Sequence, residues 1–310
     1  MPKRPTTQAP CTLSASRCAD RASRRPTHLT RWFLLPLLWL GALYSATAEE
    51  RLSIELSDGT RLEARFVLPE GGNPPYPAVM LFGGLETGAQ AINLLPGFDA
   101  HIAFASFDYP YTPPRRFRLW KNLGELPKAR QAIADTIEGV GVLYQALAAH
   151  PKVDPQRITV VGASLGAPFA MIAAGQQPIP GVVSVQGFGA LEDVIAHQFH
   201  LAWGEDYGVV GRWAGSVVAR LITWYADLPS PEAHAEQLRA SQNALVIVSR
   251  DDQRIPQAAS DALWEAVQAS PAGARRIDME GGHLYTGADA MIRQLLSITL
   301  DWKQDVGLLE

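Results

Sequence analysis

Residues 157–175 have the sequence RITVVGASLGAPFAMIAAG. The first half is a continuous apolar run typical of a buried strand, and the second half predicts an apolar helix that ends at Gly175. Between them lies Gly162-Ala163-Ser164-Leu165-Gly166, in which glycines stand two positions before and after a serine. A strand that turns abruptly into a helix strains the backbone of the central residue and leaves room only for small neighbours. We therefore expect the Ser164 hydroxyl to project from the end of the strand as a nucleophile.

Two backbone amides are expected to stabilise negative charge beside Ser164. The amide of Leu165 lies at the start of the helix, where unpaired N–H groups and the positive end of the helix dipole face the serine. A second amide is expected from the loop FGGL at 82–85, whose glycines let the backbone approach a substrate closely. We favour Gly84, with Leu85 as the alternative. An ordinary strand-ending turn is the simpler interpretation of this loop.

A serine nucleophile needs a base, and the base needs an acid that orients it. Asp251 and Asp252 follow the apolar run ALVIVSR, and His283 follows RRIDMEGG, so both residue types stand at the ends of expected strands. We assign His283 as the base. We assign Asp252 as the acid because the acid of such a site usually lies a few residues before a loop proline, here Pro256. Asp251 is the alternative acid, and either aspartate could instead form a turn or cap a helix.

The rest of the chain alternates strand and helix patterns. Residues 51–68 alternate apolar and polar side chains around Asp58-Gly59, which predicts a hairpin. Further strands are expected at PAVMLF, HIAFASF, GVVSV, ALVIV and RRIDM, and helices over about 126–150, 258–269 and 288–303. This alternation predicts an α/β fold with a mostly parallel eight-stranded sheet and helices on both faces. No boundary divides residues 49–310, so we expect one domain.

Residues 191–240 depart from this alternation. Trp203, Trp213 and Trp224 lie among glycines here, and the run WAGSVVARLITWY has helical spacing. We expect a small helical insertion over the edge of the sheet. Two interpretations of it stay open: a lid over the site, or aromatic side chains that simply pack onto the core.

The first 48 residues have the pattern of a signal peptide with an extended polar leader. Arg31 precedes an apolar run of 13 residues (32–44), and Ala46-Thr47-Ala48 follows as a small-residue cleavage site. The apolar run is short for a bilayer core about 30 Å thick, which favours a cleaved signal over an anchor. Cleavage after Ala48 predicts a periplasmic or secreted product.

Charge and cysteine positions argue against several other kinds of chemistry. Residues 1–48 hold 7 of the 27 basic and one of the 31 acidic residues, so residues 49–310 carry 20 basic against 30 acidic side chains. This acidic body argues against nucleic-acid binding. Cys11 and Cys18 precede the cleavage site, so disulfides and thiolate chemistry are not expected in the mature chain. His197 and His200 have metal-ligand spacing, but no matching acidic cluster lies nearby, and we expect neither a metal nor another cofactor.

The run VDPQRITVVGASLGAPFAMIAAG, with SDGTRLEARFVLPEG before it and DDQRIP and GGH after it, resembles the α/β-hydrolase superfamily. The most similar branches are the dienelactone-hydrolase-like proteins and the acyl esterases, and the resemblance covers nearly all of residues 51–303. The cysteine nucleophile of true dienelactone hydrolases is absent. The resemblance implies the following roles: Ser164 as nucleophile, His283 as base, Asp252 as orienting acid, and the amides of Leu165 and Gly84 as an oxyanion hole.

The function that this resemblance implies is hydrolysis of small-molecule carboxylic esters through an acyl-enzyme. A serine peptidase of the prolyl-oligopeptidase-like branch is the first alternative. It is disfavoured because peptidases of this fold usually add a large propeller domain. A non-catalytic binding protein on the same fold is the second alternative, and the completeness of the expected site argues against it.

Overall fold

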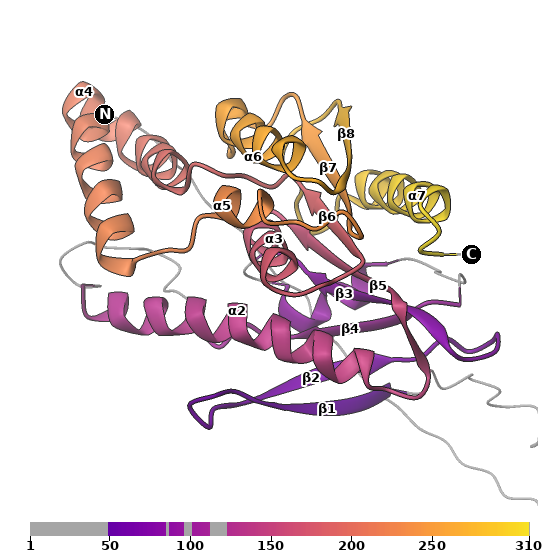
Figure 1. Ribbon diagram of the computed structural model, residues 1–310. Coiled ribbons are helices and arrows are strands. Elements are labelled where there is room, and N and C mark those ends of the chain that lie inside the picture. The colour runs from indigo at the N-terminus through magenta and orange to yellow at the C-terminus, as the bar shows by residue number, and fades with distance from the viewer. Residues whose placement is uncertain (1–48, 85–86, 96–100, 112–122, 310) are drawn as a thin grey trace, which may run out of the picture. The chain divides into compact units, whose positions relative to one another are not determined.

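One sheet of eight strands organises the part of the chain that the structure describes, residues 49–84, 87–95, 101–111 and 123–309 of a computed structural model (Figure 1). The order across the sheet is β1-β2-β4-β3-β5-β6-β7-β8. β2 is antiparallel to both of its neighbours, and all other pairs are parallel. The prediction of a mostly parallel eight-stranded sheet is therefore confirmed. The strands are β1 (Glu49–Glu55), β2 (Arg61–Val67), β3 (Tyr76–Phe82), β4 (Ala103–Phe107), β5 (Val153–Ala163), β6 (Gly181–Val185), β7 (Asn243–Ser249) and β8 (Gly273–Met279).

The predicted hairpin joins β1 to β2 around Gly59. Its φ of 85° is a conformation that glycine adopts without steric cost, and its amide donates to Leu56 O at 2.9 Å. The Leu56 amide in turn donates to Thr60 O at 2.9 Å, which closes the turn.

Helices cover both faces of the sheet, as predicted. Ile158 and Val160 of β5 pack in one apolar cluster with α2, α3 and α6, whereas Val161 and Ala163 pack in a second cluster with α7. Because both faces are covered, the central strands are apolar on both sides, and this accounts for their unbroken apolar runs. The helices are α2 (Leu126–Ala148), α3 (Gly166–Gln176), α4 (Leu191–Ala226), α5 (Pro231–Ala235), α6 (Gln257–Ala269) and α7 (Asp289–Asp305), with 3-10 helices η1 (Gly88–Leu94) and η2 (Leu123–Glu125).

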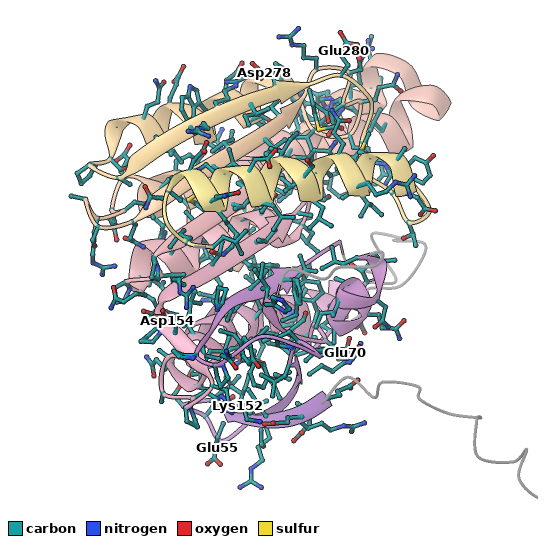
Figure 2. The ribbon with its side chains drawn as sticks, turned by 90° about the vertical axis from the view of Figure 1, so that its right-hand side faces the viewer. Glu55, Glu70, Lys152, Asp154, Asp278 and Glu280 are labelled. Atoms are coloured by element: carbon teal, nitrogen blue, oxygen red, sulfur yellow. The ribbon has the colours of Figure 1, made fainter. Side chains whose placement is uncertain are left out.

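Figure 2 looks onto α7, which lies across one face of the sheet. The charged side chains labelled in this view are Glu55, Glu70, Lys152, Asp154, Asp278 and Glu280. The interior beneath α7 is apolar, and it forms one wall of the cavity described below.

The insertion is a pair of helical arms within α4. The arms meet at Gly208, whose φ of 57° and ψ of −132° are not helical, and Gly215 of the second arm packs closely against Phe199 of the first. Trp213 and Trp224 are 69% and 78% exposed, so neither packs onto the core, and that interpretation of them is wrong. In Figure 1 α4 and α7 lie on opposite sides of the molecule, and α3 and α5 lie between them. Among the described residues, no helix is both long enough and apolar enough to cross a membrane.

Two features expected from the sequence fall outside the described residues. They are the leader at 1–48 and the alternative oxyanion residue Leu85.

Candidate active site

The turn between β5 and α3 holds Ser164 in a strained conformation. Its φ is 52°, in the left-handed region that non-glycine residues seldom adopt. The Ser164 amide donates to Val185 O of β6 at 2.9 Å, and its carbonyl accepts from the Ala167 amide at 3.0 Å. A Cβ at Gly162 would lie 2.3 Å from Gly166 O, and one at Gly166 would lie 2.1 Å from Phe82 O. Only glycines at these two positions leave room for the turn.

Three side chains form a continuous hydrogen-bonded chain at this turn. Ser164 Oγ lies 2.9 Å from His283 Nε2, and His283 Nδ1 lies 2.7 Å from Asp252 Oδ2. The carboxylate accepts the proton on Nδ1, which assigns that tautomer and leaves Nε2 as the acceptor for the serine hydroxyl. The side chains of His283 and Asp252 are only 11% and 6% exposed.

The structure brings Asp252, and not Asp251, to the histidine. Asp251 instead accepts a long hydrogen bond from the Gly281 amide at 3.4 Å. Asp252 Oδ1 accepts from the amides of Arg254 and Ile255 at 2.8 and 3.0 Å. Burial alone would raise the pKa of the Asp252 carboxyl, but the hydrogen bonds from His283 and these amides outweigh burial and lower the pKa below its ordinary value. The group is therefore an anion that can stabilise an imidazolium.

Gly84 and Leu165 line the same cavity as Ser164 and His283. Leu165 precedes the first turn of α3, so its amide is among those that no helical carbonyl can reach. The Tyr109 hydroxyl donates to Gly83 O at 2.7 Å. Because the carbonyl and amide of a trans peptide point in opposite directions, this bond turns the Gly84 N–H away from Tyr109. The Gly84 carbonyl oxygen accepts hydrogen bonds from both the amide and the hydroxyl of Thr87.

The sequence pattern did not predict a role for Tyr109 in the site. In the sequence it is simply an aromatic residue that follows an apolar strand. Its ring packs against Phe169 of α3 with centroids 5.8 Å apart, and burial raises the pKa of its phenol. The hydroxyl therefore stays a neutral donor to Gly83 O.

Solved structures share this arrangement of strands and helices. A 2,6-dihydroxy-pseudo-oxynicotine hydrolase is 24% identical with a TM-score of 0.58, over 83% of this chain and 68% of that one. The acetyl xylan esterase from Paenibacillus sp. R4 is 18% identical with a TM-score of 0.55, over 81% of this chain and 89% of that one. A puromycin-hydrolyzing peptidase of Mycobacterium tuberculosis is 19% identical with a TM-score of 0.60, over 86% of this chain but only 41% of that one.

The chain has the α/β-hydrolase fold. At these identities the likeness shows the fold and not the substrate. No protein-family model matches the sequence, and no curated protein matches it.

In this α/β-hydrolase fold a buried glutamine holds the histidine loop from both sides. Gln186, 2% exposed and with a φ of 48°, follows β6 directly. Its Oε1 accepts from the Leu284 amide at 2.6 Å, and its Nε2 donates to Gly282 O at 3.0 Å and to Ser249 Oγ. Gln186 thus fixes the backbone immediately before and after His283. In the sequence the only signal was a polar residue at the end of an apolar strand.

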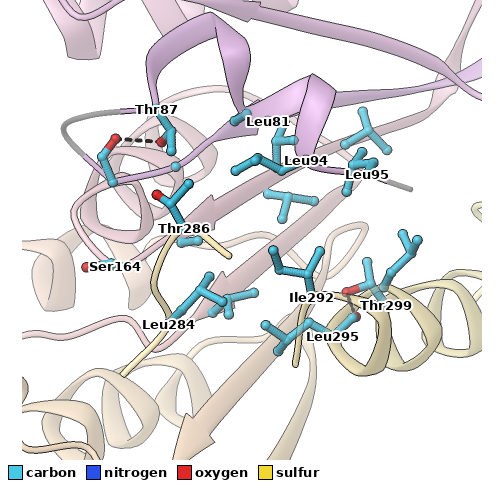
Figure 3. Close-up of a pocket in the computed structure, with 18 of the residues that line it drawn as sticks. Leu81, Thr87, Leu94, Leu95, Ser164, Leu284, Thr286, Ile292, Leu295 and Thr299 are labelled. Atoms are coloured by element: carbon cyan, nitrogen blue, oxygen red, sulfur yellow. Dashed lines mark hydrogen bonds between the residues drawn. The ribbon is translucent and has the colours of Figure 1, made fainter. Parts of the chain in front are cut away.

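A cavity of about 680 Å³ opens from Ser164 between the sheet and α7. In Figure 3 Ser164 lies at one end of its lining and Thr299 of α7 at the other. Most of the side chains between them are apolar, among them Leu81, Leu94, Leu95, Leu284, Ile292 and Leu295. An extended apolar group attached near Ser164 can therefore be removed from water here.

The two histidines with metal-ligand spacing are bonded elsewhere. His197 Nε2 lies 2.9 Å from Gln253 O, and His200 Nε2 lies 2.9 Å from Arg212 O and 3.1 Å from Ser216 Oγ. Within the described residues no group of three His, Cys, Asp or Glu side chains is arranged to hold a metal ion.

Proposed function

We propose that this protein is a serine hydrolase that cleaves carboxylic esters. The observation that carries the proposal is the hydrogen-bonded chain from Asp252 through His283 to Ser164 at the mouth of an apolar cavity. The base is within hydrogen-bond distance of both the nucleophile and the orienting acid, as acyl transfer requires.

The proposed reaction has two acyl transfers. Ser164 Oγ attacks the ester carbonyl as His283 takes its proton, and the resulting oxyanion is stabilised by the amides of Leu165 and Gly84. The bond to the alkoxy oxygen then breaks, and His283 gives its proton to the departing alcohol. Water, deprotonated by His283, attacks the acyl-enzyme, and the carboxylic acid leaves as the proton returns to Ser164. Asp252 stabilises the imidazolium in both halves of the reaction.

The shape and lining of the cavity favour an ester over a peptide. A peptide carries polar backbone groups on both sides of the scissile bond, and burying them without partners is costly. The apolar lining offers few such partners but suits a hydrocarbon acyl chain. A peptidase activity is the alternative, because a peptidase is among the proteins of similar fold.

A fluorophosphonate probe tests for a reactive serine. We expect the wild-type protein to be labelled and Ser164→Ala to remain unlabelled. Absence of labelling, under conditions in which a control esterase reacts, would contradict the enzyme proposal and favour a binding protein. A panel of short-chain and long-chain 4-nitrophenyl esters with an aminoacyl 4-nitroanilide then separates the two hydrolase activities, and faster cleavage of the anilide would contradict an esterase.

We also propose that residues 1–48 direct export and are removed. The support is the apolar run at 32–44 followed by small residues at 46–48. Fractionation of expressing bacteria should place the product in the periplasm or the medium, with Glu49 at its N-terminus by mass spectrometry. A product that keeps residue 31 and sediments with membranes would contradict cleavage.

A further inference from the structure

Lys303 is a buried basic side chain with one hydrogen-bond partner among the described residues. It lies in the last turn of α7 and is 0% exposed. Its Nζ donates to Thr159 Oγ1 of β5 at 2.6 Å. Within the described residues, this is the one acceptor that reaches the group, and no carboxylate forms an ion pair with it. An ammonium has three donors, and a buried charge without a counter-charge is costly.

Lys303 also lines the cavity that begins at Ser164. Ile292, Leu295, Thr299 and Lys303 recur at three- and four-residue intervals, so they share one face of α7. In Figure 3 Thr299 lies at the end of the lining away from Ser164, and Lys303 follows Thr299 by one helical turn of α7. The lining therefore continues from the nucleophile to the lysine.

The residues around Lys303 are buried. Trp302 and Leu308 are 1% and 4% exposed, and Thr159 is fully buried. Thr159 lies five residues before Ser164 on β5, which corresponds to roughly 16 Å along the strand. An extended chain on the order of ten atoms spans most of that distance, at roughly 3.6 Å per three covalent bonds.

We propose that the cavity binds an acyl chain that ends in a carboxylate, with Lys303 and Thr159 as the recognition site for that end. The inference rests on the proposed ester hydrolysis, and it names the substrate class as monoesters of medium-length dicarboxylic acids. The acyl part, and not the alcohol, occupies the cavity because the alcohol must leave and water must enter while the acyl group is still attached to Ser164.

The charge state of Lys303 is consistent with this assignment. Burial, with a smaller contribution from the positive charge of Arg157, lowers the pKa of Lys303 to about 7. A carboxylate within hydrogen-bond distance favours the protonated form of the lysine. The ligand would supply the counter-charge that the described residues do not.

Two matched esters test the specificity. The mono-4-nitrophenyl ester of decanedioic acid and 4-nitrophenyl decanoate have acyl chains of equal length and differ at the far end. We expect the wild-type protein to favour the first by roughly tenfold or more in kcat/KM, since a hydrogen bond to a charged group contributes about 1.5–3 kcal/mol. Lys303→Met should abolish this preference by lowering kcat/KM for the first ester, and Lys128→Met, at an exposed lysine, should leave both rates unchanged.

Direct binding separates this inference from the proposed activity. Ser164→Ala should bind monomethyl decanedioate more tightly than methyl decanoate in calorimetry, and Ser164→Ala with Lys303→Met should not. Equal effects of Lys303→Met on both 4-nitrophenyl esters, or equal binding of both methyl esters, would overturn the inference even if ester hydrolysis is found. If no ester is turned over, the binding measurement still decides whether Lys303 recognises a carboxylate.

Discussion

His283 depends on two kinds of contact that act on different parts of the residue. Asp252 orients the imidazole ring through Nδ1, and Gln186 fixes the peptides on either side of the residue. A base displaced by about 1 Å can cost on the order of a hundredfold in rate. Ring orientation and loop position are therefore separately testable.

Asp252→Ala should lower kcat by roughly a thousandfold to ten-thousandfold, because the imidazole loses both its orientation and its counter-charge. Asp251→Ala is the matched control, since within the described residues that carboxylate accepts a hydrogen bond from the Gly281 amide and not from His283. We expect it to stay within about threefold of wild type, as residues outside a catalytic hydrogen-bonded chain usually do. Steady-state kinetics on a 4-nitrophenyl ester measures both. A large loss in Asp251→Ala alone would reassign the acid.

Gln186→Leu should lower kcat by roughly tenfold to a hundredfold with KM nearly unchanged, because the substrate still binds but the base is misplaced. Gln242→Leu is the control. Gln242 is equally buried and donates to Ala174 O and Ile179 O at the opposite end of the strands. Both variants leave buried groups unpaired, at about 1–3 kcal/mol of stability. Equal kcat losses in the two variants would show that Gln186 acts only on stability.

At the scale of elements, the junction of β5 and α3 places the nucleophile where three strands end side by side. Ser164 follows β5, Gln186 follows β6, and Asp252 lies three residues after β7. Because neighbouring parallel strands end at the same edge of a sheet, residues far apart in the chain meet there. The junction depends on the backbones of β3 and α3 lying close together, which the two glycines permit.

Gly162→Ala should lower the free energy of unfolding by about 2 kcal/mol or more, since the new methyl group meets backbone atoms of Gly166 and Ala167 that cannot move aside cheaply. Gly141→Ala in α2 is the control, because its nearest neighbour would be the Gln177 side chain at an ordinary 3.5 Å. We expect that variant to gain roughly 0.5–1 kcal/mol from helix propensity. Urea unfolding compares them, and an unaffected Gly162→Ala would contradict the steric account of the turn.

At the scale of the whole molecule, the described part of the chain is stabilised by two apolar clusters on opposite faces of one sheet. The cluster beneath α7 borders both the cavity and Lys303. Any specificity that the buried lysine confers is therefore obtained at the expense of core stability, because the same volume could hold an apolar side chain.

Lys303→Met should raise the melting temperature, and more so at about pH 6 than at about pH 9. In the unfolded chain Lys303 keeps its proton up to about pH 10.5, whereas in the folded chain it loses it near pH 7. The unfolded state thus binds more protons between these values, and this residue makes wild-type stability rise with pH across that window. Calorimetric scans measure the difference, which should shrink toward pH 10.5. A difference independent of pH would contradict the burial effect.

The sequence by itself determined the order of strands and helices, the β5–α3 turn and the residue types at three strand ends. These follow from local steric rules and from apolar periodicity, which any covered parallel sheet imposes. It favoured Asp252 over Asp251 only through the position of Pro256, because adjacent residues share the same local pattern, and the tertiary structure shows which carboxylate reaches His283. It did not determine that Tyr109 and Gln186 fix the site, or that Lys303 lies in the cavity. Each of these acts on partners between 26 and 144 residues away in the chain, and only the packing of the sheet and α7 brings them together.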